Sequence, residues 1–373
     1  MQTVAQSWLV LELTGSSLKL GIVTALQFLP SLVLSFFAGP LIDYFPKRKI
    51  ILACQAILMV QAFLLAALVL TGSVLYWHVV ILATVLGITN AIDMPARQSF
   101  IIELVGREDL MNAIALNSSI FNGARAIGPA LAGMVIAFAG TGLCFFLNGL
   151  SYLAVLWVLF LLNPGKEEVR DRIPLDMAKE ISEALRYVRS TPVIRTTILL
   201  VAVVSIFGAN FNVLVPVFAR LELQRDAAAF GFLMSSFGGG ALIGAISLTY
   251  FSRFGPKRTF LLGSGRGLSF FLILIGLQKS YGMTALLLAA CGWCIVTFFG
   301  NANTTIQLKS EDRLRGRVMS LYTMAFGGLS PFGSMFAGTF SNWLHAPLTF
   351  ALGGIITGLF FLVAAFGKDE ATN

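Results

Sequence analysis

Long apolar runs without charged side chains are the feature that most constrains this chain. A bilayer core about 30 Å thick is crossed by a helix of roughly 20 apolar residues. Eight such runs occur along the sequence, at Leu20–Ile42, Ile50–Leu70, Tyr76–Ile92, Ala126–Gly165, Thr196–Ala219, Ala227–Ser252, Ser280–Leu308 and Val318–Gly367, and a ninth, Thr259–Gln278, is apolar apart from Arg266. Two of the runs, Ala126–Gly165 and Val318–Gly367, are long enough for two spans each, turning at Gly140-Thr141-Gly142 and near Asn342–Pro347. The sequence therefore predicts eleven full transmembrane helices.

The composition also points to lipid as the main solvent. Of 373 residues, 57% are apolar and 12% are charged, against about 45–50% and about 25% in an average soluble domain. Too few polar side chains are present to cover a globule in water. The apolar runs do not alternate with the two-residue period of a membrane β-barrel. We therefore expect an all-α polytopic membrane protein.

The first residues form a shorter apolar segment. Gln2–Leu13 is about half as long as a membrane span. It has neither a basic leading region nor a small-residue cleavage site, so it does not resemble a signal peptide. We interpret it as the second half of a first helix whose beginning is missing, which would make Met1 an internal methionine of a longer protein.

The basic residues predict the orientation in the membrane. The net charge of +8 would suggest nucleic-acid binding in a soluble protein, but here Lys and Arg are distributed between two sets of short connections. Eleven lie in one set, at Lys47, Arg48, Lys49, Arg107, Arg253, Lys257, Arg258, Lys309, Arg313, Arg315 and Arg317, and four lie in the other, at Lys19, Arg220, Arg225 and Lys279. The positive-inside rule places the first set, and with it the C-terminus, in the cytoplasm.

The longest connection, at about Asn163–Pro192, also belongs to the cytoplasmic set. Within it, Ile173–Arg189 carries apolar residues at helical spacing and charged residues on the other faces. This pattern predicts an amphipathic helix at the cytoplasmic membrane surface. Such a helix can act as a tether between two halves or as a docking site for a partner.

An internal repeat divides the chain into two halves. Three landmarks recur in the same order at offsets of 203, 202 and 209 residues: Glu108-Asp109 with Glu311-Asp312, Gly128-Pro129 with Ser330-Pro331, and Asp43–Lys49 with Ser252–Arg258. Parallel six-helix repeats are a transporter architecture with a substrate site near the membrane midplane. We expect one half at residues 1–163, a linker at 164–192 and the second half at 193–373.

Three strings resemble the major facilitator superfamily, and in particular its drug and siderophore exporter branch. They are the loop Gly39-Pro40-Leu41-Ile42-Asp43-Tyr44-Phe45-Pro46-Lys47-Arg48-Lys49, the segment Asp93-Met94-Pro95-Ala96-Arg97-Gln98, and Asn117–Gly133 with its Gly128-Pro129 and Gly133. The resemblance covers nearly the whole chain. It departs at Tyr44 and Pro46 in the loop, and at Ala83, where the family has an arginine that is linked to proton coupling.

The resemblance assigns the loop a role in gating. It implies that Asp43, with Lys47 and Arg48, holds the two halves together in the outward-facing state. A carboxylate at the end of a hydrophobic helix can pair with a cation or with a neighbouring helix N-terminus. The alternative is a solvated charge beside two basic residues.

Charged residues inside the apolar helices are further gating or coupling candidates. Asp93 and Arg97 are spaced i, i+4 and so share a helix face. The pair is either a gate that carries protons or a structural pair near the interface. Arg125 lies about 24 Å into a helix that starts after Asp109. It either binds an anionic substrate or a carboxylate partner, or braces the gate through backbone carbonyls.

The resemblance implies that the first, fourth, seventh and tenth spans line the substrate cavity, and polar residues in otherwise apolar runs are candidates for this cavity. They are Asn90, Asn122, Asn210, Asn301 and Asn303, with Asn212 and Gln307 nearby. The alternative role is hydrogen bonding between helices. Gly128, Pro129 and Gly133 form a helix-packing motif, in which small residues permit close approach and the proline kinks the helix.

Other chemistry is excluded or unsupported. Cys291 and Cys294 fall inside an apolar span and are expected to be buried thiols, while His78 and His345 are isolated, so we expect no metal and no cofactor. The sequence has no P-loop and therefore no expected nucleotide. Arg266 is expected to reach toward lipid head groups.

Together these observations predict a proton-driven secondary exporter of a small amphipathic molecule in the bacterial inner membrane, with protons and lipid as further partners. A proton-coupled importer and an inactive truncated transporter are the alternatives. A polytopic membrane enzyme is disfavoured, because the outer loops are too short to carry a catalytic cluster.

Overall fold

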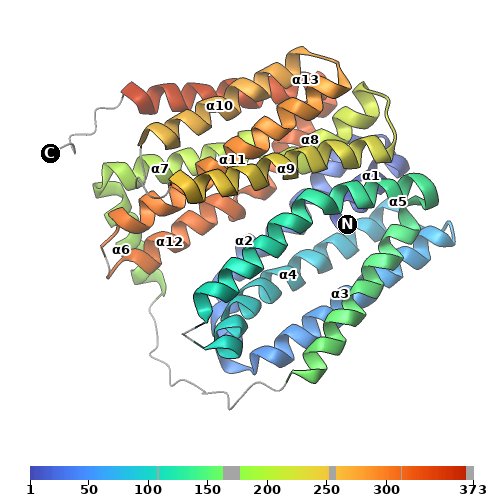
Figure 1. The fold of residues 1–373 in the computed structure, drawn as a ribbon, viewed down its shortest axis with the longest axis horizontal. Helices are drawn as coiled ribbons and strands as arrows, with labels where there is room; N and C mark the ends of the chain where they lie inside the picture. The colour runs from blue at the N-terminus through green and yellow to red at the C-terminus, as the bar shows by residue number, and fades with distance from the viewer. Residues whose placement is uncertain (107–108, 163–176, 252–257, 312, 367–373) are drawn as a thin grey trace.

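The computed structural model describes residues 1–106, 109–162, 177–251, 258–311 and 313–366. Within these ranges the chain runs from helix to helix without a β-strand (Figure 1). Nine of the described segments are long and apolar enough to cross a membrane. Two of them, Gly123–Leu161 and Arg315–Ala365, break once internally, which gives 9 + 2 = 11 spanning legs. The all-α membrane fold predicted from the apolar runs is confirmed.

The N-terminal helices are α1 (Gln2–Thr14), α2 (Ser17–Tyr44), α3 (Lys47–Leu70), α4 (Tyr76–Val105) and α5 (Leu110–Leu161). The helix α5 contains the first predicted turn, because Gly140 has φ 79° and ψ 173° inside it. A side chain at this backbone conformation would be strained, so glycine is the residue that can reverse the chain here. Asp109 occupies the N-cap position of α5.

The C-terminal helices follow the linker helix α6 (Met177–Ser190). They are α7 (Pro192–Val203), η1 (Val204–Gly208), α8 (Phe211–Val217), η2 (Phe218–Glu222), α9 (Ala227–Phe251), α10 (Arg258–Leu277), α11 (Tyr281–Lys309), α12 (Arg315–Thr323), η4 (Met324–Gly328) and α13 (Ser330–Phe366). The three η segments are single π-helical turns, a feature found mostly at functional sites. The second predicted turn lies at His345, whose φ is 64°.

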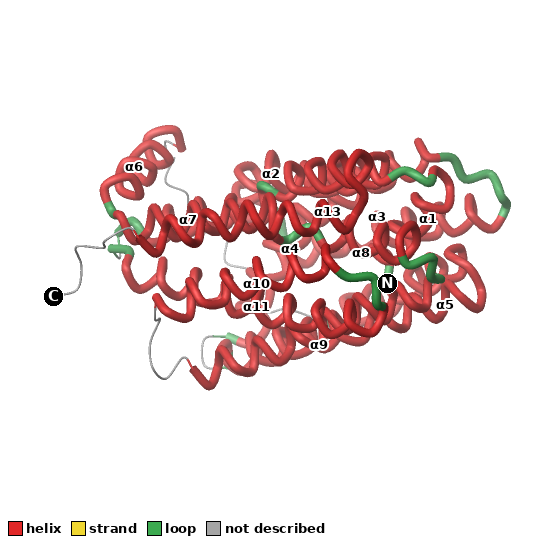
Figure 2. The backbone as a smooth tube through the Cα atoms, turned by 90° about the horizontal axis from the view of Figure 1, so that it is seen from above, coloured by secondary structure: helices red, strands yellow, loops and turns green. Residues whose placement is uncertain are grey.

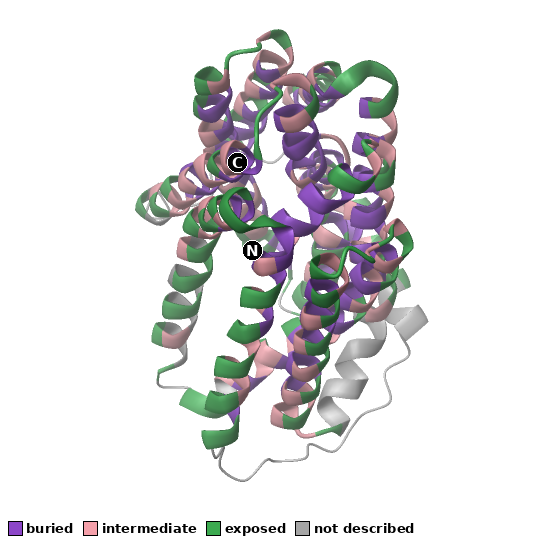
Figure 3. Ribbon diagram, turned by 90° about the vertical axis from the view of Figure 1, so that its right-hand side faces the viewer, coloured by how far each residue is buried: buried purple, intermediate pink, exposed green. Residues whose placement is uncertain are grey.

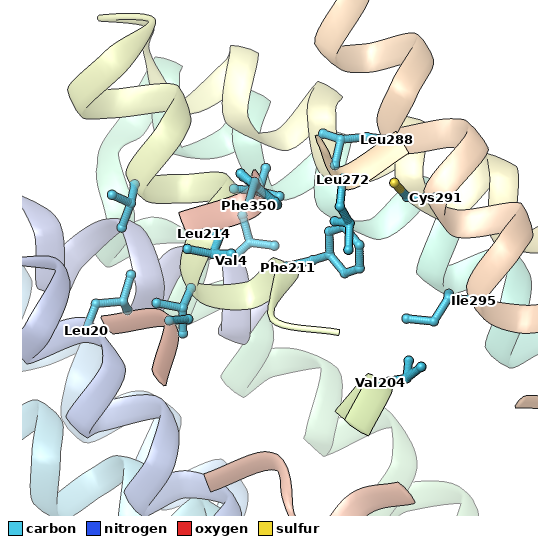
Figure 4. Close-up of a cluster of buried hydrophobic side chains, with 14 of the residues drawn as sticks. Val4, Leu20, Val204, Phe211, Leu214, Leu272, Leu288, Cys291, Ile295 and Phe350 are labelled. Carbon is cyan, nitrogen blue, oxygen red and sulfur yellow. The ribbon is translucent and has the colours of Figure 1, made fainter. Parts of the chain in front are cut away.

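The helices lie side by side along the long axis of the molecule (Figure 2). Buried residues gather where the helices face one another, and exposed ones lie on the outward sides (Figure 3). One hydrophobic cluster joins N-terminal and C-terminal helices, with Val4 and Leu20 beside Phe211 and Phe350 (Figure 4). Many outward side chains are large and apolar, such as Phe138 at 90% exposure. Such a surface is typical of a protein that faces lipid.

Small residues let the two groups of helices approach at two crossings. A Cβ placed on Gly21 of α2 would lie 2.8 Å from the Cα of Gly338 in α13, and one on Gly133 of α5 would lie 2.8 Å from the Cα of Gly231 in α9. At the second crossing the backbone N–H of Ala130 also donates to Ser235 Oγ at 2.7 Å. Close backbone approach through glycine is the usual way in which membrane helices associate.

The bundle has two ends, named here the Gly140 end and the Lys47 end. The Gly140 end carries the turns at Gly15, Gly140 and His345, and the Lys47 end carries the start of α3, α6 and the start of α12. Both glycine crossings lie on the half of the helices that leads to the Gly140 end. The last residues of α13 and the helix α6 lie at the opposite side of the molecule from α1 (Figure 1).

The linker helix α6 is fastened to the C-terminal helices at the Lys47 end. Glu183 pairs with Arg313 Nη2 at 3.0 Å and with Arg317, and Tyr187 Oη accepts from the backbone N–H of Glu311 at 3.2 Å. Ala184 and Val188 are buried against the protein. The part of the predicted amphipathic helix before Met177 lies outside the described residues. The part from Met177 on therefore places its apolar face at least partly on protein.

Neutralising Glu183 is expected to loosen α6. Partial desolvation opposes ionisation of this carboxyl, but Arg313 and Arg317 outweigh it and hold the pKa of Glu183 below its ordinary value of 4.5. The ion pair is therefore fully formed above that value and is lost as the pH falls through the lowered pKa. We expect faster amide hydrogen exchange in Met177–Ser190 for Glu183→Gln at pH 7. Arg186→Gln, an exposed change on the same helix, is the control, and equal exchange in both variants would contradict the prediction.

Candidate functional site

A buried carboxylate is the first element of the candidate site. Asp93 lies in the second half of α4 and is 6% exposed. Its Oδ1 accepts from Gln55 Nε2 of α3 at 3.0 Å, and its Oδ2 accepts from Arg97 Nε at 2.6 Å. A charge removed from water is costly unless it is paired and hydrogen-bonded. Here both carboxylate oxygens have a donor.

The two partners of this ion pair differ in accessibility. The side chain of Asp93 is 8% exposed and that of Arg97 is 42% exposed. The i, i+4 spacing predicted that they share a face, and the structure places them in contact. Protonation of Asp93 removes the charge that holds Arg97 in place, so one proton can change the position of an exposed cation. Gln55 was not predicted as a partner, although it is a polar residue in the apolar run of α3.

The basic residues at the start of α3 bind to the N-terminal helices. Lys47 Nζ forms an ion pair with Glu103 of α4. Arg48 donates from Nε to the carbonyl of Leu159 at 2.8 Å, and from Nη2 to that of Phe160 at 2.9 Å. These contacts satisfy carbonyls at the end of α5, which have no partner within the helix. The side chains of Asp43 and Asn122 lie outside the described part of the structure.

Arg125 lies on α5 and its side chain is exposed. At 3.6 residues per turn, five exposed apolar side chains of α5 form one stripe, and the exposed Phe121 lies off it; the five are Ile120, Ile127, Leu131, Met134 and Phe138. Arg125 lies on the other side of the helix from this stripe. Its guanidinium carbon is 5.6 Å from the ring centre of Phe121, within range of a cation–π interaction. An exposed cation of this kind can meet an anionic group that approaches α5.

The predicted cavity asparagines fall into three situations. Asn210 and Asn301 are each 7% exposed and donate to the carbonyl four residues earlier, Ile206 at 2.6 Å and Thr297 at 2.9 Å. Asn303 accepts from Gln307 Nε2 at 2.6 Å on the same helix. Asn90 is half-buried on α4. The structure does not bring these side chains together in one cluster.

A polar pocket of about 60 Å³ connects α2 with the η1–α8 segment and with α13. It is lined by Thr24, Phe28, Ser205, Ala209, Asn210, Asn212, Val213, Ser330 and Ser334. Asn210 and Asn212 were noted in the sequence as cavity candidates, whereas the hydroxyl residues were not, and Ser330 was noted only as part of the internal repeat. The sequence feature that could have indicated this pocket is the pair Ser330 and Ser334, two hydroxyl residues one helical turn apart in an apolar run.

A second group of contacts joins the helices at the Gly140 end. Trp8 Nε1 donates to Glu12 Oε1 at 2.7 Å, and Arg220 Nη1 lies 3.8 Å from the same oxygen. The guanidinium of Arg220 also lies 5.1 Å from the Trp8 ring centre, and Trp8 stacks on Phe230 at 5.9 Å. Trp8 and Glu12 belong to α1, and the other two residues belong to C-terminal helices. Sequence reasoning did not identify this cluster, because Glu12 lies in the segment interpreted as an incomplete helix.

The remaining candidates lie apart from these groups. Cys291 and Cys294 are free buried thiols in the hydrophobic cluster. Arg266 is exposed on α10. Across the described ranges, no three His, Cys, Asp or Glu side chains gather closely enough to hold a metal ion. Gly133 lies in the α5–α9 crossing, whereas the space around Gly128 is open.

Comparisons with known proteins agree with this arrangement. The family model described as "Transmembrane secretion effector" matches residues 1–369. The multidrug efflux pump Tap of Mycolicibacterium fortuitum is 25% identical over 371 residues, covering 97% of this chain and 90% of that protein. The staphyloferrin A transporter of Staphylococcus aureus is 25% identical over 367 residues, covering 95% and 88%.

Solved structures show the same fold at lower identity. A D-xylose-proton symporter has a TM-score of 0.79 at 12% identity, covering 99% of this chain and 94% of that one. A bacterial homologue of the human lysosomal transporter Spinster, crystallised in an inward-facing and unoccupied conformation, has a TM-score of 0.69 at 16% identity, covering 98% and 92%. These likenesses concern the fold alone.

Proposed function

The chain belongs to the transmembrane secretion effector family of the major facilitator superfamily, and on that basis we propose that it exports a small amphipathic molecule in exchange for protons. As a member of this family it is a membrane transporter and not an enzyme. Export is supported by the multidrug efflux pump among its relatives, and a siderophore-type substrate is supported by the staphyloferrin A transporter.

The proposed mechanism is alternating access between two bodies. Residues 1–163 and 193–373 rock against each other, and residues 164–192 connect them. The glycine crossings and the Trp8–Glu12–Arg220 cluster support a conformation that is closed at the Gly140 end. The basic residues support a cytoplasmic Lys47 end, and with it a cytoplasmic C-terminus, in a bacterial inner membrane. In this orientation the closed end is the outer one.

The buried Asp93 is the observation that carries the coupling proposal. It is a carboxylate in a membrane-spanning helix, and such residues usually pair with one another and often act in ion pathways. Its proton would be exchanged when the cavity opens, with Arg97 released on protonation and bound again on deprotonation. Arg125 is proposed to hold the anionic part of the substrate from the opposite side of the cavity, with Asn90, Asn122, Asn210, Asn301 and Asn303 as further cavity residues.

Inverted membrane vesicles with a pH-sensitive dye test this function. Energised vesicles containing the protein receive siderophores, antibiotics and lipophilic cations in turn, beside vesicles without the protein. We expect one substrate class to release protons from the lumen above the control. Proton movement in the opposite direction on substrate addition would indicate symport and an importer. If direct uptake of labelled substrates is also absent, export is contradicted for that panel.

A further inference from the structure

The membrane span Pro192–Glu222 is interrupted at the polar pocket. The helix α7 continues as the π turn η1 to Gly208, Ala209 and Asn210 are not helical, and α8 starts at Phe211. A second π turn, η4, lies against η1, and Ser205 Oγ of η1 donates to the carbonyl of Phe326 in η4 at 3.1 Å. In transporters, discontinuous helices expose backbone carbonyls that bind ions or polar groups near the membrane midplane. The pocket therefore lies where such a site is expected.

Three of the side chains that line this pocket already use a donor group in a hydrogen bond to a backbone carbonyl. Thr24 Oγ1 donates to Leu20 O at 2.9 Å, Ser205 Oγ donates to Phe326 O, and Asn210 Nδ2 donates to Ile206 O at 2.6 Å. All three residues are more than 90% buried. A hydroxyl has one hydrogen to donate and two lone pairs. Thr24 and Ser205 can therefore offer only lone pairs to an occupant of the pocket.

The size of the pocket limits what can occupy it. Its volume of about 60 Å³ exceeds the roughly 10–15 Å³ that one water needs, but it is far below the roughly 300 Å³ of small drug pockets. An entire amphipathic substrate does not fit. A single small ion, or one small group at the end of a larger molecule, does.

We propose that the break between η1 and α8 forms a site for a small monovalent cation, either Na⁺ or a primary ammonium group. The nine lining residues include no carboxylate, so the cation is coordinated by the neutral oxygens of the lining side chains. The ligands come from α2 on one side and from η1, α8 and α13 on the other. An occupied site therefore holds N-terminal and C-terminal helices together on the half of the bundle that is closed.

The test measures binding and is independent of transport direction and of proton coupling. The purified full chain in detergent is unfolded by heat in sodium, potassium, methylammonium or choline chloride at equal ionic strength. Choline is the control because its quaternary group is too large for the pocket. We expect a saturable rise of several degrees in Tm with sodium, with methylammonium or with both. A response to sodium identifies a free ion, and a response to methylammonium alone identifies the head group of a substrate.

Two matched threonine variants link the effect to the pocket. Thr24→Val removes one lining oxygen with little change of shape, and is expected to raise the half-saturating concentration about tenfold. Thr197→Val is the control, because Thr197 is equally buried and bonds the carbonyl of Val193 in the same way, but lies outside the pocket. Asn210→Asp adds a carboxylate and is expected to tighten cation binding. Equal Tm in all four salts, or equal loss in both threonine variants, overturns the proposal.

Discussion

Asp93→Asn is expected to reduce proton-coupled transport to the level of vesicles without the protein. Asparagine keeps the size of the side chain and can still accept from Gln55, but it cannot exchange a proton or balance the charge of Arg97. The measurement is substrate-dependent proton movement in inverted vesicles, with expression and Tm followed in parallel. The physical reason is that Asp93 is a buried carboxylate in contact with Arg97, and we propose that its protonation state sets the position of that cation.

A loss of folding must be separated from a loss of coupling in this experiment. Asp93→Asn leaves Arg97, whose side chain is 42% exposed, without its anionic partner, and a partly desolvated cation with no counter-charge is itself destabilising. The double variant Asp93→Asn/Arg97→Gln removes both charges, so we expect its Tm to recover while transport stays absent. Glu103→Gln is the matched control, because Glu103 is a carboxylate on the same helix that pairs with Lys47 at the surface. Full transport by Asp93→Asn would refute the coupling role.

The apolar runs were sufficient to predict the spans but not the full lengths of the helices. The run Tyr76–Ile92 continues as α4 to Val105, and the run that begins at Ala126 belongs to α5, which starts at Leu110, directly after Asp109 as the sequence predicted. In both cases the additional turns contain polar or charged residues. Hydropathy measures what faces lipid, whereas a helix continues for as long as its backbone is hydrogen-bonded and its polar side chains find partners or water. Boundaries therefore differ where a span extends past the apolar core of the bilayer.

Only the contacts of the candidate site that lie within a single helix could be predicted from the sequence. The contact between Asp93 and Arg97 follows from i, i+4 spacing alone. Gln55 could not be assigned to Asp93 from the sequence, because its position depends on how α3 packs against α4. The polar pocket depends on contacts between α2, η1 and α13, which lie far apart in the sequence. The break at Asn210 has no such local rule, because single polar residues occur throughout these helices without breaking them.

The glycine crossing of α5 and α9 yields the second large prediction. A Cβ on Gly133 would lie 2.6 Å from the carbonyl oxygen of Ala227 and 2.8 Å from the Cα of Gly231. These atoms belong to the backbone of α9, so no rotamer change can relieve the clash. A leucine at this position must push the two helices apart. We expect Gly133→Leu to abolish transport by preventing closure of the Gly140 end, while Gly133→Ala has a smaller effect in the same direction.

A cysteine reporter distinguishes an open end from an unfolded protein. Ser7 is 5% exposed and its hydroxyl donates to Asn212 O of α8 at 3.4 Å, so it lies between N-terminal and C-terminal helices. The native cysteines are all buried, which keeps background labelling low. With Ser7→Cys as the reporter, we expect Gly133→Leu to increase labelling by a membrane-impermeant maleimide several-fold. The size-exclusion profile of the purified variant is expected to stay monodisperse, which shows that the protein is still folded.

The control for this prediction comes from the same helix. Gly123 of α5 has open space where a Cβ would be placed, so Gly123→Leu makes the same chemical change without meeting α9. Both variants replace glycine with a better helix former, and this effect therefore cancels in the comparison. If the two variants label Ser7→Cys equally and transport equally, contact at the α5–α9 crossing does not control closure. If only Gly133→Leu labels and loses transport, closure of the Gly140 end is a necessary step in the transport cycle.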